Sequence, residues 1–205
     1  MKRKVWCLLL SLTWLVQVAQ GSRQHIWPTV SVYQKPAISI SRFFSTNTQF
    51  TKSLRYNIYT FTVTAADSGR VREVKIKAYR GELLLTNFHI KVDGAVVGAE
   101  VADLDNNRFP ELYVYSASDG SGSFGRVYAW QFLPERKADI TPVNWRSPLV
   151  KGYMGHDIVW AERNILCRKF PVYASGDANA EPSGGYQMIR YKLQASGTNF
   201  ALVAE

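Results

Sequence analysis

Oxygen-bearing side chains recur at short intervals between Asp103 and Glu111. Asp103, Asp105, Asn107 and Glu111 stand at relative positions 1, 3, 5 and 9 of this segment. Oxygen ligands at alternate positions of a loop can wrap around Ca²⁺. Arg108, however, stands where such loops usually carry glycine, and its positive charge opposes a cation. The sequence therefore favours a structural turn capped by its own Asp and Asn side chains, with calcium binding as the alternative.

A second segment, Ser118–Gly125, combines small residues with one large one, Phe124. Its glycines and serines cannot shield the ring, so Phe124 either folds back onto its own domain or is offered to a partner. Three glycines of the segment fit the dinucleotide-binding pattern G-x-G-x-x-G, which must open a helix. Because the following run, Arg126–Phe132, is strand-like, the sequence excludes that function.

Groups suited to catalysis are few. The only histidines are His25, His89 and His156, and no G-x-S-x-G nucleophile elbow occurs. His156 and Asp157 are adjacent, so their side chains would point apart on a strand. There is no zinc-ligand spacing, and Cys167 has no evident catalytic partner. We expect a protein that is not an enzyme, and its scattered positive charges do not favour nucleic acid.

The first 21 residues are typical of a secretory signal peptide. A basic start, Lys2–Lys4, precedes the apolar run Val5–Val18 and the small-x-small cleavage site Ala19-Gln20-Gly21. The apolar run is shorter than the roughly 20 residues that span a bilayer, so we expect no membrane span. The predicted mature protein is periplasmic or secreted and begins at Ser22. Its net charge falls from +9 to +6, and its one cysteine, Cys167, is expected to be buried without an internal disulfide.

The segment from Ser22 to Arg55 contains no acidic residue and no sustained periodicity. It is expected to form a basic N-terminal extension, with at most a short strand at Ser31–Tyr33, ahead of a β domain covering 56–205. Its charge suits a solvated linker or contact with an acidic polymer.

Short strand-like runs separated by turn residues fill the β domain. They are Tyr56–Thr64, Val74–Ala78, Leu83–Leu85 followed by Phe88, Ile90 and Val92, then Val96–Val101, Glu111–Ser116, Arg126–Phe132, Ile158–Trp160, Ile165–Tyr173, Ile189–Leu193 and Phe200–Val203. Asp93-Gly94 has the composition of a hairpin turn. Prolines break the chain into a loop between 134 and 148. No amphipathic helix is evident, so the pattern predicts an all-β fold, an antiparallel β-sandwich or sandwich-like barrel.

One hairpin stands out because neither of its faces is polar. It joins Glu111–Ser116 to Arg126–Phe132 around the loop Ser118–Gly125. Side chains alternate across a strand, and here both sets are apolar or aromatic. We therefore expect this hairpin to be covered on both sides.

Several of these segments, taken in order, resemble one known family. They are Val97–Asp105, Pro110–Tyr115, Ser121–Gly125, Gly152–Asp157, Arg168–Tyr173, Gly176–Ala180 and Gly184-Gly185. Together they resemble the periplasmic inhibitors of invertebrate-type (I-type) lysozyme, over roughly Tyr56 to Val203. The resemblance implies a β-sandwich-like inhibitor, used in bacterial defence, whose Ser-Gly-x-Tyr loop enters the lysozyme cleft. In this chain the loop is Ser121-Gly122-Ser123-Phe124, with Phe124 replacing the tyrosine.

Physical reasoning is consistent with that role. Lysozymes cleave glycosidic bonds with two carboxyl groups. Glycines keep a blocking loop slim, and the Ser121 hydroxyl can both donate to and accept from carboxyl groups. From the residues alone, Arg126 is expected to face the charged carboxylate. The expected partner is an I-type lysozyme, and a homodimer is left open. The alternative is an exported carbohydrate- or calcium-binding β module without inhibitory activity.

Overall fold

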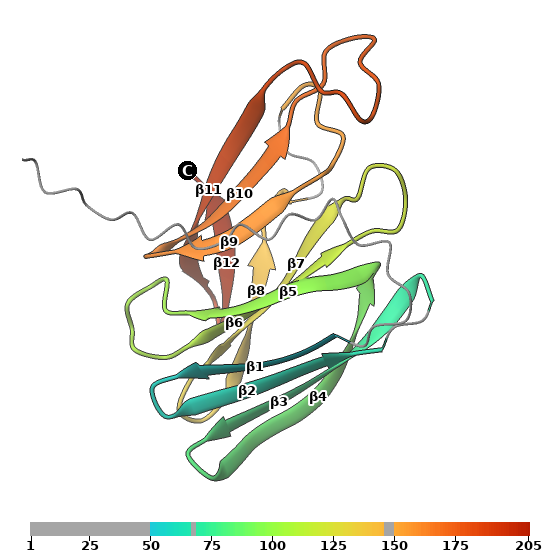
Figure 1. Ribbon diagram of the computed structural model, residues 1–205. Coiled ribbons are helices and arrows are strands. Elements are labelled where there is room, and N and C mark those ends of the chain that lie inside the picture. Colours follow the sequence, from blue (N-terminus) through green and yellow to red (C-terminus); the bar gives the residue numbers. More distant parts are fainter. Residues whose placement is uncertain (1–49, 67–68, 146–149) are drawn as a thin grey trace, which may run out of the picture. The chain divides into compact units, whose positions relative to one another are not determined.

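The computed structural model describes residues 50–66, 69–145 and 150–205, which form the twelve strands labelled in Figure 1. The expected signal peptide, the Ser31–Tyr33 strand and residues 22–49 of the basic extension lie outside these ranges. The strands are β1 Phe50–Tyr56, β2 Tyr59–Ala65, β3 Val71–Arg80, β4 Leu83–Asp93, β5 Ala95–Ala102, β6 Glu111–Ala117, β7 Gly125–Phe132, β8 Lys137–Pro142, β9 Ile158–Glu162, β10 Ile165–Pro171, β11 Tyr186–Ser196 and β12 Asn199–Ala204.

The predicted all-β class is confirmed. The described residues contain no helix, and so none that is long and apolar enough to cross a membrane. One sheet has the order β1-β2-β3-β4, and the other has the order β5-β6-β7-β8-β12-β11-β10-β9. All pairings are antiparallel except the parallel pair β8–β12. The edge strands β5 and β9 of the larger sheet meet where the Ala161 N–H donates to Glu100 Oε2 at 2.7 Å, so this sheet is a nearly closed barrel.

Two hydrophobic cores lie on opposite sides of the β6–β7 hairpin. Leu112, Val114 and Trp130 pack against the buried face of the smaller sheet, which alternates apolar residues with threonines along β2. Tyr113 and Tyr115 point the other way, into the core of the larger sheet. The expectation that this hairpin is covered on both faces is therefore confirmed. Every residue of β6 is buried.

The structure corrects three details of the sequence prediction. The run Tyr56–Thr64 is two strands, because Asn57 adopts a positive φ of 50° and turns the chain between β1 and β2. The sheet consequently begins by Phe50, within the segment expected to be an extension. Asp93-Gly94 joins strands of different sheets and is not a hairpin turn. Finally, β8 forms in the segment expected to be a loop.

Gly94 is required at the crossover between the sheets. Its φ is +77°, and a Cβ there would lie 1.8 Å from the carbonyl oxygen of Ala117. Its N–H donates to the Arg70 carbonyl at 2.8 Å. The glycine thus allows the chain to leave β4 and pass directly beside the end of β6.

Candidate functional site

The loop that joins β6 to β7 closes on itself. We call residues 118–124 the tip loop. The Ser118 N–H donates to the Phe124 carbonyl at 3.0 Å, and the Phe124 N–H donates to Ser118 Oγ at 2.9 Å. Phe124 keeps 37% of its surface exposed while its ring packs edge-on against Tyr153, with centroids 5.7 Å apart. The ring therefore rests partly on Tyr153 and keeps the rest of its surface open to solvent.

Two neighbouring loops hold the backbone of the tip loop. The His156 N–H donates to the Gly122 carbonyl at 2.7 Å. Asn179 Nδ2 donates to the Ser121 carbonyl at 2.6 Å. Gly155 lies so close that a Cβ on it would be 1.9 Å from the Gly122 oxygen. The segment Gly152–Asp157, here called the strap, therefore packs directly against the middle of the tip loop.

A buried ion pair lies beneath the base of the tip loop. Arg168 Nε and Asp157 Oδ1 are 2.7 Å apart, and both side chains have no exposed surface. Asp157 Oδ2 accepts hydrogen bonds from the Gly125 N–H at 2.8 Å and from the Tyr153 hydroxyl at 2.7 Å. The Gly125 carbonyl accepts from Trp145 Nε1 at 2.9 Å. Both polar backbone groups of Gly125 are thus held by buried side chains.

The guanidinium of Arg168 completes this cluster. It donates to the Trp145 carbonyl at 2.8 Å and to the Tyr153 hydroxyl at 2.6 Å. Its carbon lies 4.4 Å from the Trp145 ring centroid. Burial alone lowers the pKa of Arg168, but the Asp157 charge raises it above its usual value, so the side chain stays charged. Burial, followed by the charge of Asp157, raises the pKa of Tyr153, which keeps its proton.

The predicted loop residues come together at one end of the β6–β7 hairpin. Ser121 is exposed, and Ser123 takes a positive φ of 42°. Arg126 is half-buried, and its Nη1 donates to the Gly125 carbonyl at 3.3 Å, so its head lies beside the loop base. Sequence reasoning did not single out Asp157 and Arg168 as a pair. The only signal was that both lie in segments noted for the family resemblance.

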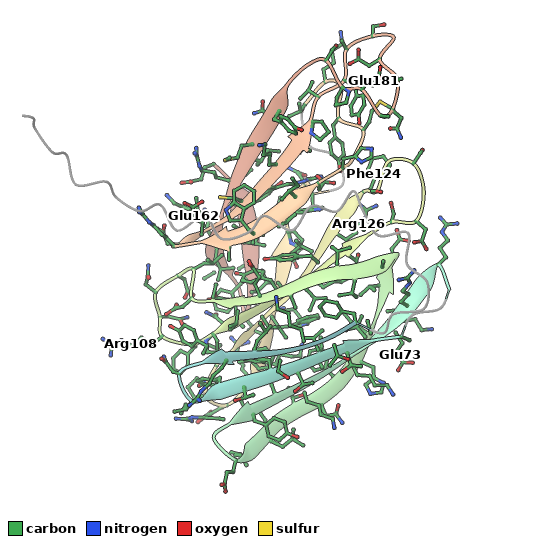
Figure 2. The ribbon with its side chains drawn as sticks, viewed as in Figure 1. Glu73, Arg108, Phe124, Arg126, Glu162 and Glu181 are labelled. Atoms are coloured by element: carbon green, nitrogen blue, oxygen red, sulfur yellow. The ribbon has the colours of Figure 1, made fainter. Side chains whose placement is uncertain are left out.

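The acidic loop brings its carboxylates together at the other end of β6. One oxygen from each of Asp103, Asp105 and Glu111 can be chosen so that all three lie within 4.8 Å of one another. Burial, followed by the charges of Asp105 and Asp103, raises the pKa of Glu111 to about 8, although hydrogen bonds from the Leu104 N–H and Gln131 act to lower it. Arg108 is exposed and projects outward from the loop in Figure 2. The Arg108 charge is therefore turned to solvent, while its backbone takes a positive φ of 70°, the conformation that usually favours glycine.

In comparisons with known proteins, no family model and no curated protein matches this chain.

Proposed function

We propose that this chain is an exported protein inhibitor that blocks the active-site cleft of an I-type lysozyme with Ser121–Phe124. The proposal rests on the motif resemblance together with the geometry of the tip loop. It assigns no catalytic residue and no cofactor to the inhibition itself.

The observation that carries the proposal is an exposed aromatic ring on a braced loop. Among the described residues, nine large apolar side chains keep more than a third of their surface exposed, and Phe124 is one of the two aromatic rings in that set. Gly122 and Gly125 on either side of it are held by hydrogen bonds to the strap and to Asp157. A binding segment that is already ordered loses less entropy when it binds. This suits an inhibitor, which gains affinity by presenting a preformed anchor.

The chemistry of the tip loop fits a cleft with two carboxyl groups. Ser121 is exposed, and among the described residues its hydroxyl forms no hydrogen bond, so the hydroxyl is available to a partner; its backbone carbonyl accepts from Asn179. A hydroxyl can donate to the charged carboxylate and accept from the protonated one. Phe124 would fill an apolar subsite beside them.

The test is titration of an I-type lysozyme with the purified protein, using bacterial cell walls as substrate. We expect the wild-type protein to abolish lysis at a stoichiometric ratio. The Ser121→Ala, Phe124→Ala double variant should bind at least about a hundredfold more weakly, because it loses a hydrogen bond to an ionisable group and an aromatic anchor.

A matched control is Leu83→Ala, which removes another exposed apolar side chain, at the first residue of β4. This variant should inhibit like the wild type. The proposal is wrong if the double variant remains folded by circular dichroism and inhibits as strongly as the control.

A further inference from the structure

We propose that the loop Asp103–Glu111 is a calcium site, with Asp103, Asp105 and Glu111 as its charged ligands. This inference is independent of lysozyme inhibition, since the loop lies at the opposite end of β6 from the tip loop. It assigns a second, structural ligand to the domain.

The ligand set is the first argument. The three carboxylates can place one oxygen each within 4.8 Å of one another, which is the spacing of oxygens around one cation. All three ligands are hard carboxylate oxygens, and the set contains no nitrogen or sulfur atom. Ca²⁺ accepts six to eight such oxygens in irregular geometry, whereas Mg²⁺ demands a near-ideal octahedron. An irregular loop rich in carboxylates therefore favours calcium.

Buried polar groups without partners give the second, independent argument. The Tyr113 side chain has no exposed surface, and its hydroxyl forms no hydrogen bond. The hydroxyl lies near the acidic loop, because the charges of Glu111, Asp105 and Asp103 add to burial in raising the pKa of Tyr113. Gln131 Oε1 and Asp103 Oδ1 are likewise buried and unpartnered. Such groups are rare in native proteins and point to a missing ion or water. A hydrated cation here would accept the two oxygens as ligands and offer a bound water to the Tyr113 hydroxyl.

Existing hydrogen bonds hold the cluster in place without neutralising it. Gln131 Nε2 donates to Asp105 Oδ2 at 2.9 Å and to Glu111 Oε1 at 3.0 Å. The Leu104 N–H donates to Glu111 Oε2 at 2.8 Å, and the Arg108 N–H donates to Asp103 Oδ2 at 2.9 Å. Among the ion pairs of the described residues, none involves these carboxylates. The donors are uncharged backbone and amide groups, so no cationic side chain of these ion pairs competes with a divalent cation for the carboxylates.

The loop also connects the two sheets. The Tyr56 hydroxyl, at the end of β1, donates to Asp103 Oδ2 at 2.8 Å. Glu111 opens β6 of the larger sheet. Calcium bound between these residues would hold the junction of the sheets as well as the loop itself. The expected consequence of binding is thus a rise in the stability of the whole domain.

The first measurement is thermal unfolding of the full chain after EDTA treatment and dialysis, with and without CaCl2. Calcium sites in extracellular modules have dissociation constants of about 0.1–1 mM. At the tight end of that range, about 1 mM CaCl2 should favour the folded state about tenfold and raise Tm by about 3–6 °C. The rise should saturate, and MgCl2 at the same concentration should give a clearly smaller one.

Variants and a luminescent probe locate the site. Terbium(III), which occupies calcium sites, should emit on ultraviolet excitation of the nearby tyrosines, and calcium should quench that emission by competition. Glu111→Gln should abolish both the emission and the Tm response. Glu181→Gln, at an exposed residue of another loop, is the matched control and should keep both.

The proposal is overturned if the wild-type protein shows neither a calcium-dependent Tm nor terbium emission that calcium displaces. The loop would then be a turn held by its own hydrogen bonds alone. Because both readouts use the wild-type chain, this outcome can be reached even if Glu111→Gln does not fold. A Glu111→Gln variant that folds and still responds like the control would also overturn it.

Discussion

Removing the carboxylate of Asp157 is the sharpest perturbation of the tip-loop base. Asp157→Ala leaves the Arg168 guanidinium buried without its counter-ion, 2.7 Å from where the carboxylate stood. It also removes the acceptor for the Gly125 N–H and the Tyr153 hydroxyl. Breaking a fully buried pair in this way costs about 3–5 kcal/mol of the free energy of unfolding. For a domain of this size that corresponds to a fall in Tm of about 6–20 °C.

The assay is urea or thermal unfolding followed by circular dichroism, with lysozyme inhibition measured where the variant is still folded. Asp139→Ala is the control, because it breaks an exposed pair with Lys137 and should cost at most about 1 kcal/mol. If the cost comes from the uncompensated charge, the double variant Asp157→Ala, Arg168→Met should lose less stability than the sum of the single variants. The reasoning is refuted if Asp157→Ala is no less stable than the control.

Three further outcomes are expected. Gly155→Ala should lower the free energy of unfolding and weaken inhibition, because the added Cβ would collide with the Gly122 carbonyl oxygen. Gly176 is the control: its φ of +95° is similar, but no atom lies within 4 Å of an added Cβ. Gly176→Ala should therefore show only the smaller cost of a positive φ in the same unfolding assay. Phe124→Tyr, which introduces the hydroxyl usual in the inhibitors that this chain resembles, should tighten the proposed inhibition; weaker inhibition would mean that the ring enters an apolar pocket. Burial, then the charge of Glu162, raises the pKa of the Cys167 thiol to about 11, so a thiol reagent at pH 8 should label the folded protein about a hundredfold more slowly than the unfolded one.

Local patterns predicted the elements that depend on local chemistry. The two apolar faces of Glu111–Ser116 were visible in the sequence, and the structure places a hydrophobic core on each side of it. The buried position of Cys167 in an apolar run was also predicted correctly. In these cases the periodicity of a single segment carries the information, since side-chain alternation follows from strand geometry.

Features that depend on distant partners could not be predicted in this way. β8 has only Ala138 and Ile140 as buried apolar residues, and it becomes a strand by pairing with β7 and β12. In the sequence, Asp157 and Arg168 look like ordinary surface charges. Their burial as an ion pair depends on the fold, which brings them together. Asp93-Gly94 has the composition of a hairpin turn, and only the tertiary packing of Gly94 against Ala117 shows that it crosses between sheets.

The position of β12 has a consequence for how the chain folds. Although it follows every other strand in sequence, β12 lies inside the larger sheet, between β8 and β11. It pairs with β8 in parallel, with Phe200 opposite Ile140. Until this segment is available, β8 and β11 both expose unpaired edges, which are prone to association with other chains. We therefore expect the β8–β12 pairing to form after the local β11–β12 hairpin, and removal of residues 199–204 should promote aggregation during refolding.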